Sequence, residues 1–134
     1  RQYLCFHAPS IADQWRPMSF SFMALKSGTV RLCLRGPWYK PADQVVKVWV
    51  MYDDVSVQNS VVRNPGFEEQ TAGAPAPWFL GKRDGFLAVH HLDESRVRSG
   101  KGCIEVCHDV DGWQSIPVQA QQTVTITVWH RRGE

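Results

Sequence analysis

The chain lacks the features that define several large classes of protein. Its 134 residues contain no run of about 18 apolar residues, so no transmembrane helix is predicted. The formal net charge is only +2 and no basic tract is present, which argues against nucleic-acid binding. No segment carries the apolar period of an amphipathic helix. The length allows one domain with its own core, over residues 1–134, and is too short for two.

Recognised catalytic motifs are also missing. The sequence has no nucleophile-elbow pattern, no histidine pair at helical metal-ligating spacing and no glycine-rich phosphate loop. His90 and His91 are adjacent in a predicted strand and point to opposite faces, so they cannot serve one site. The remaining acids lie mostly in predicted loops: Asp93, Glu94, Glu105, Asp109 and Asp111. We therefore expect a protein that is not an enzyme, and a small lyase or hydrolase is the least favoured hypothesis.

Cysteine is scarce, with four residues in the chain. Cys103 and Cys107 are four residues apart in a predicted strand, which separates their Cα atoms by roughly 13 Å, too far for a disulfide. Cys5 and Cys33 lie on different predicted strands and could pair if those strands are neighbours; the alternative is half-buried thiols. The spacings do not match those of a structural zinc site.

Period-two alternation of apolar and polar residues dominates what is present. Candidate strands span residues 2–8, 18–25, 29–35, 45–57, 86–92, 103–108, 113–119 and 123–131. Turn-forming clusters such as Lys26-Ser27-Gly28 and Asp109-Val110-Asp111-Gly112 separate them. Many short strands at this spacing predict an antiparallel β-sandwich or jelly roll.

The alternation also sorts each strand into two faces. The predicted core face carries Leu4, Phe6, Val30, Leu32, Leu34, Val46, Val48, Val50, Val124, Ile126 and Val128. If the strands share a sheet, the opposite face carries Tyr3, His7, Arg31, Arg35, Lys47, Trp49, Trp129 and Arg131. That outer face would be both aromatic and cationic. Among the other tryptophans, Trp15 and Trp78 are expected in the core, and Trp38 with Tyr39 could form a loop lip.

A face of this composition suits a saccharide ligand. A sugar ring presents an apolar C–H surface that stacks on a flat aromatic ring, and its hydroxyl rim is bound by polar side chains. Cations among the aromatics favour uronic acids or sulfated sugars. Trp113 and Gln114 could extend the groove at its rim. The alternative is that Trp49 and Trp129 serve packing under loops.

Several short motifs carry a resemblance to a known family. They are Asn64-Pro65-Gly66-Phe67-Glu68, Ser99-Gly100-Lys101, Gly112-Trp113-Gln114, Thr127-Val128-Trp129 and Tyr52-Asp53-Asp54-Val55. Together they resemble the jelly-roll carbohydrate-binding modules of the galactose-binding-like superfamily, which are appended to xylanases and other glycanases. The resemblance implies a non-catalytic module that holds a polysaccharide, in a secreted protein of the extracellular space or periplasm, as part of a larger multidomain protein. No nucleic-acid or membrane partner is expected.

The resemblance also implies site residues. The groove tryptophan of the family corresponds to Trp129. A structural Ca²⁺ in such families would be held here by the carboxylates of Glu68 and Asp54 and by the backbone carbonyl of Lys101, an all-oxygen set that suits a hard cation. Asp54 and Glu68 as ordinary turn-capping acids are the alternative.

The order of the motifs departs from that of the family. Residues 1–57 match the C-terminal half of a module and residues 61–134 match the N-terminal half. A circular permutation through the short segment 58–62 would explain this order, because sandwich termini often lie close together. A homodimer that exchanges halves is the alternative. A protein–protein or cell-surface interaction module that uses the same aromatic face is the competing functional hypothesis.

Overall fold

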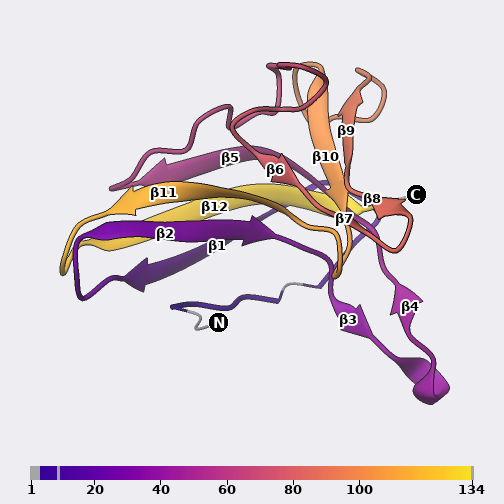
Figure 1. Ribbon diagram of the computed structural model, residues 1–134, viewed down its shortest axis with the longest axis horizontal. Helices are drawn as coiled ribbons and strands as arrows, with labels where there is room; N and C mark the ends of the chain where they lie inside the picture. Colours follow the sequence, from indigo (N-terminus) through magenta and orange to yellow (C-terminus); the bar gives the residue numbers. More distant parts are fainter. Residues whose placement is uncertain (1–3, 9, 134) are drawn as a thin grey trace.

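The computed structural model describes residues 4–8 and 10–133 (Figure 1). Apart from one 3₁₀ turn at Pro41–Asp43, the regular structure of these residues is entirely β-strand. Every strand pair is antiparallel. The predicted all-β, antiparallel class is therefore confirmed. In the described ranges, no helix has the length and apolar character needed to cross a membrane.

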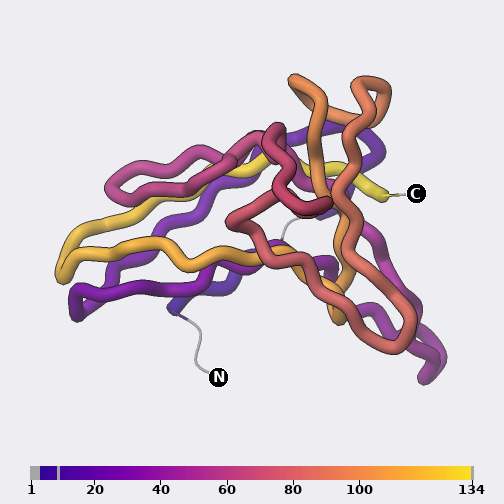
Figure 2. The backbone as a smooth tube through the Cα atoms, turned by 45° about the horizontal axis from the view of Figure 1, so that its top comes forward, coloured from indigo at the N-terminus to yellow at the C-terminus, as the bar shows by residue number. Residues whose placement is uncertain are grey.

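Two sheets make up the body of the molecule (Figures 1 and 2). The five-stranded sheet has the order β1 (Arg16–Met23), β12 (Thr123–Arg132), β5 (Val50–Gln58), β10 (Gly102–Val106) and β9 (Val89–Leu92). The three-stranded sheet has the order β2 (Gly28–Leu34), β11 (Gly112–Val118) and β6 (Phe79–Leu80). Two small hairpins pair β3 (Trp38–Tyr39) with β4 (Val46–Lys47) and β7 (Lys82–Arg83) with β8 (Phe86–Leu87). The β3–β4 hairpin projects from the body in both views.

The two sheets share one apolar core, which makes the fold sandwich-like. Alternate residues of β12 and β2 point into this core. The predicted core positions Leu32, Leu34, Val124, Ile126 and Val128 are all buried. Ile116 and Val118 of β11 and Val50 and Tyr52 of β5 join the same cluster. Trp78 is buried as predicted, and Trp15 is half-buried. Alternation located these residues because each strand has one face against the other sheet.

Two of the predicted strands are broken in the structure. Residues 45–57 divide into β4 and β5, and residues 86–92 divide into β8 and β9. Residues 48–49 interrupt the strand, so β4 and β5 do not share one alternation of buried and exposed faces. Val46 is therefore exposed in the hairpin and is not part of the core. Trp49 is half-buried and packs against the core, which corrects its predicted place on an outer face.

The predicted strand at residues 2–8 is not formed over its described part. Residues 4–8 are in no strand, and the side chains of Leu4 and Phe6 are 55% and 76% exposed. Tyr3 lies outside the described residues. The prediction is wrong because an alternating segment forms a strand only when it pairs with a neighbour. Among the described residues, the edge strand β2 pairs only with β11.

A β-bulge interrupts the pairing of β5 with β12. Thr127 pairs with Ser56 and Trp129 pairs with Asp53, so Asp54 and Val55 together oppose Val128. Asp54 has a φ of 50°, a left-handed conformation that bends the strand locally. The bulge turns consecutive acids in different directions: Asp53 is fully buried and Asp54 is half-buried.

Phe67 anchors the segment that precedes β6 and provides a test of the core. Its side chain is 0% exposed, and its ring centroid lies 4.9 Å from that of Trp78. Phe67→Ala should lower the free energy of unfolding by about 3–5 kcal/mol, because a large cavity would open. Phe86→Ala, at a residue that is 42% exposed, should cost less than about 1 kcal/mol. Urea unfolding of both variants measures the difference; equal losses would contradict the assigned core.

Candidate functional site

Four of the sequence motifs meet on the outer face of the five-stranded sheet. The bulge of β5 brings Asp53 and Asp54, β12 brings Trp129, and the segments 64–69 and 98–102 lie against them. A hollow of about 270 Å³ opens here. It is lined by Asp54, Val55, Ser56, Pro65, Gly66, Arg98 and Trp129. The antiparallel topology, not proximity in sequence, assembles this group.

The carboxylate of Asp53 ties the loop before β10 to the sheet. Its Oδ2 accepts the backbone N–H groups of Arg98 at 3.0 Å and Ser99 at 3.3 Å. Its Oδ1 accepts the N–H of Asp54 at 2.8 Å. Burial raises the pKa of Asp53 to about 7, and the charge of Asp54 adds to this rise, while the three N–H donors act in the opposite direction. The loop therefore depends on one buried acid.

Asp54 and Glu68 form a pair of carboxylates around Gly66. Asp54 Oδ2 accepts from Ser99 Oγ at 2.6 Å, and Glu68 Oε2 accepts from the N–H of Lys101 at 2.7 Å. Their other oxygens, Asp54 Oδ1 and Glu68 Oε1, each lie 3.6 Å from the point where a Cβ on Gly66 would stand. Both oxygens thus lie at van der Waals distance from one point beside Gly66.

An arginine covers the indole of Trp129. The guanidinium carbon of Arg98 lies 3.7 Å from the ring centroid, within cation–π range. Arg98 Nη1 also donates to Asp54 Oδ2 at 3.0 Å. The guanidinium is thus held between an aromatic face and a carboxylate. Sequence reasoning missed Arg98; its position directly before Ser99-Gly100-Lys101 was the available signal.

The predicted cationic cluster is divided between two faces. Arg131 accompanies Trp129 on β12, and its Nε is buried without a hydrogen-bond partner among the described residues. Arg31 lies on β2 in the other sheet, where its guanidinium carbon is 3.6 Å from the ring centroid of Trp113. Arg35 donates from Nε and Nη2 to the carbonyl of His108. The prediction of a single aromatic and cationic face is therefore wrong, because the strands that carry these residues do not all belong to one sheet.

Other predicted groove residues lie elsewhere. Gln114 is 2% exposed and bonds the backbone of Arg63 through both ends of its amide, so it faces the interior. Lys47 pairs with Asp109 at 3.3 Å and lies over the ring of Phe86. His7 lies in the segment before β1, and its ring stacks on that of Phe20 at 6.1 Å. His90 and His91 bond Phe67 O and Glu105 Oε1 on opposite faces of β9, as predicted.

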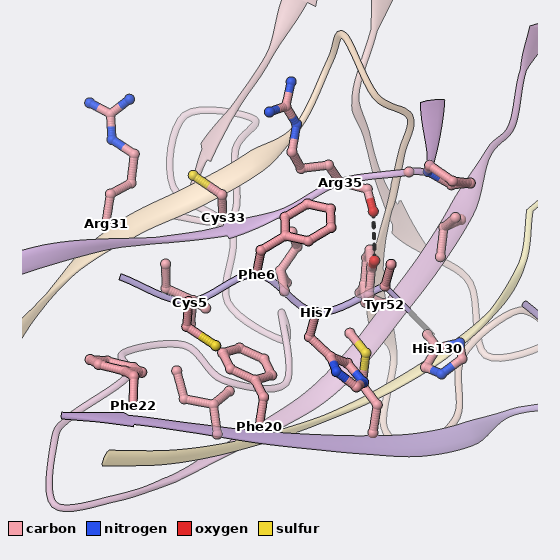
Figure 3. A pocket seen from close by; sticks show the side chains of 18 of the residues that line it. Cys5, Phe6, His7, Phe20, Phe22, Arg31, Cys33, Arg35, Tyr52 and His130 are labelled. Carbon is pink, nitrogen blue, oxygen red and sulfur yellow. Dashed lines mark hydrogen bonds between the residues drawn. The ribbon is translucent and has the colours of Figure 1, made fainter. Parts of the chain in front are cut away.

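A second, larger cavity lies between the two sheets at the open side bounded by β1 and β2. Its volume is about 690 Å³, and Figure 3 shows Cys5, Phe6 and His7 between the strand of Arg31 and Cys33 and that of Phe20 and Phe22. Tyr52 donates a hydrogen bond from its hydroxyl to Arg35 O at 2.6 Å at one end. Cys5 and Cys33 are half-buried on this side, and none of the cysteines, all of which are described, forms a disulfide. Core side chains of both sheets, among them Leu32, Ile116 and Ile126, form part of the lining, and residues 4–8 form another part.

The described part of the chain contains no cluster of three or more His, Cys, Asp or Glu side chains able to hold a metal ion. A cation between Asp54 and Glu68 would therefore need backbone or water oxygens as further ligands. Comparison of the chain with protein-family models, with curated proteins and with solved structures finds no match. The chemistry of the residues themselves carries the functional argument.

His130, which lines the larger cavity, makes the stability of the fold sensitive to pH. Burial lowers the pKa of His130, with His7 and Arg16 adding to the effect, and its Nδ1 has no hydrogen-bond partner among the described residues. Since the folded-state pKa lies below 6.5, the neutral ring stabilises the fold above that pH, and the contribution is lost as pH falls through the folded-state pKa. His130→Gln should therefore lose less stability than the wild type between about pH 7 and pH 5. Urea midpoints across this range measure it, and parallel pH profiles would contradict the assignment.

Proposed function

We propose that this chain is a non-catalytic carbohydrate-binding module that binds a glycan at Trp129. The observation that carries the proposal is the half-buried indole on the outer face of the five-stranded sheet, beside the hollow of about 270 Å³. The hollow offers the Ser56 hydroxyl and the Asp54 carboxylate beside the ring. This combination of one aromatic face with hydroxyl-binding groups matches the two surfaces of a sugar ring. An open site of this size orders few ligand groups, so modest affinity is expected.

We infer the jelly-roll family type and the permuted order from the way in which the two halves join. The N–H of Val55, in the closing strand, donates to Pro65 O in the opening segment at 2.9 Å. The short connection 58–62 is held by Ser60 Oγ, which donates to Pro117 O at 2.6 Å. One chain thereby supplies both sheets of a shared core. These contacts support a self-contained permutant over a dimer that exchanges halves.

A bound Ca²⁺ is the cofactor that we propose for the carboxylate pair. Asp54 and Glu68 would provide hard oxygen ligands near Gly66, and the backbone carbonyl of Lys101 is the third candidate. The approach of one oxygen from each acid to within 3.6 Å of the same point beside Gly66 supports this assignment. The cation would stabilise the segments 64–69 and 98–102 against β5; no bond-forming chemistry is assigned to it.

Replacing Trp129 tests the proposed sugar site. Trp129→Ala should weaken glycan binding by at least about tenfold, because a central aromatic anchor contributes about 1.4 kcal/mol or more. Affinity gels with xylans, β-glucans, mannans, pectins and sulfated algal polymers provide the measurement. Trp38→Ala, at an exposed tryptophan on the β3–β4 hairpin, is the matched control and should bind normally. Undiminished binding by a folded Trp129→Ala protein would remove the site from this face.

Calcium addition tests the proposed cofactor. Saturating Ca²⁺ should raise the melting temperature by several degrees relative to protein in a chelator, since a ligand that binds only the folded state stabilises it. Asp54→Asn and Glu68→Gln should each remove this increase. Glu94→Gln changes an exposed acid outside the pair and should retain the Ca²⁺-dependent increase in melting temperature. Differential scanning calorimetry decides the question, and a melt that is indifferent to Ca²⁺ in the wild type would refute the ion site.

A protein-interaction module is the second candidate, favoured by a different surface. Trp38, Tyr39 and Val46 on the β3–β4 hairpin and Phe86 and Leu87 on the β7–β8 hairpin are exposed. Lys47, with its Nζ 4.5 Å from the ring centroid of Phe86, links the two hairpins. Exposed apolar groups that gather in one region are typical of interaction surfaces. Binding to a protein target that Trp38→Ala abolishes and soluble glycans do not reduce would favour this candidate.

A further inference from the structure

The cover that Arg98 forms over Trp129 has a consequence for ligand binding. A sugar ring that stacks on an indole occupies the same position, a few ångströms above the ring plane, that a guanidinium occupies in a cation–π contact. The guanidinium carbon of Arg98 is 3.7 Å from the centroid of the Trp129 ring. The arginine and a stacked sugar cannot both use that indole face.

Trp129 lies between two neighbouring strands on the outer face of the five-stranded sheet. Trp129 has Pro17 of β1 and Asp53 of β5 as its cross-strand neighbours. Arg98 comes from the β5 side, where Asp53 accepts its backbone N–H. The hollow that contains Trp129 also lies on this side, since Asp54, Val55 and Ser56 of β5 line it. Arg98 and Trp129 both line this hollow, so a ligand that enters it meets the guanidinium together with the indole.

Four hydrogen bonds keep Arg98 in this position. Its backbone N–H bonds Asp53 Oδ2, its side chain bonds Asp54 Oδ2, and the next residue, Ser99, bonds the same two carboxylates. The backbone of Arg98 is thus fixed before its side chain stacks, which lowers the entropy cost of the stack. The Arg98–Asp54 ion pair is partly exposed, so it holds the side chain only weakly and can exchange partners.

We propose that Arg98 is an intramolecular cap on the sugar-stacking face of Trp129, and that Asp54 is the latch that holds the cap closed. This inference rests on the proposed glycan site and adds its regulation. A ligand must displace the guanidinium from the indole before it stacks. A neutral sugar offers no charged group to the displaced arginine. A uronate or sulfate group can replace Asp54 as the ion-pair partner of Arg98. The cap therefore disfavours neutral glycans more than acidic ones.

Cation binding and the latch share one carboxylate. Asp54 Oδ2 holds Arg98, and Asp54 is also one half of the acid pair proposed for Ca²⁺. Neutralising the charge of Asp54 weakens its attraction for the guanidinium, so the cap opens more readily when a cation is bound there. Glycan affinity should consequently depend on Ca²⁺ only in a protein that retains Arg98.

Arg98→Ala is the decisive variant. Its affinity for a neutral polysaccharide that the wild type binds should rise about three- to tenfold in the presence of a chelator, because the cap no longer competes. Added Ca²⁺ should increase the wild-type affinity and leave that of Arg98→Ala unchanged. Asp54→Asn, which removes the latch but keeps Arg98, should raise the affinity in chelator as well. Isothermal titration or affinity-gel retardation measures these values, with circular dichroism to show that each variant is folded.

Arg31→Ala provides the matched control. It removes the same type of contact, an arginine over an indole, from Trp113 on the other sheet. Its glycan affinity should equal that of the wild type. Weaker binding by Arg98→Ala would overturn the proposal and make Arg98 a direct ligand contact. An equal rise in Arg31→Ala and Arg98→Ala would overturn it too, since the gain would then be nonspecific.

A measurement without glycan separates failure of the cap from failure of the proposed function. In protein labelled with 5-fluorotryptophan, the ¹⁹F resonance of Trp129 can be assigned from Trp129→Phe. Its solvent isotope shift should increase in Arg98→Ala and in Asp54→Asn, and stay unchanged in Arg31→Ala, because only the first two uncover the ring. If the ring becomes accessible but no glycan binds any variant, the proposed function fails and the cap stands. If glycan binds and the ring does not respond, the cap fails alone.

Discussion

The buried carboxylate of Asp53 is the interaction on which the arrangement of the candidate site depends. It lies in β5, the middle strand of the five-stranded sheet, and it accepts the backbone N–H groups of Asp54, Arg98 and Ser99. A carboxylate that is 0% exposed is stable only when such donors compensate its desolvation. Two of these donors are backbone N–H groups of the loop 93–101. Their bonds to Asp53 fix the loop, with Arg98 and Ser99, against the sheet. The positions of Arg98 and Ser99 beside Trp129 follow from this one acid.

The bulge at Asp54 complements this constraint. In a regular strand, Asp53 and Asp54 would point to opposite faces, with Asp54 in the core. The extra residue and the left-handed backbone at Asp54 keep both acids away from the apolar interior while Val55 returns to the core. One acid then organises the loop, and the other lines the hollow. Strained residues of this kind are typical of sites where a side chain must be redirected.

The two outer faces use the same chemistry in different settings. Arg31 over Trp113 and Arg98 over Trp129 are both cation–π contacts of similar length. Trp113 also stacks on Phe79, with ring centroids 4.5 Å apart, so its ring is packed by two neighbours. Trp129 instead borders a hollow, and the arginine over it is shared with a carboxylate. The difference makes Trp129 the ring that a ligand can reach, at the cost of moving Arg98.

The sequence by itself determined the all-β class, most strands and most of the core, because alternation in a strand depends only on which face is buried. It also identified the motifs around Asp54, Glu68 and Trp129, whose chemistry is visible in the residues. Only the tertiary structure decided which strands share a sheet. That choice separated Arg31 and Arg35 from Trp129, turned Gln114 inward, and placed Arg98 on the indole. The physical reason is that antiparallel pairing joins residues far apart in the chain, and periodicity within one strand carries no information about its neighbour.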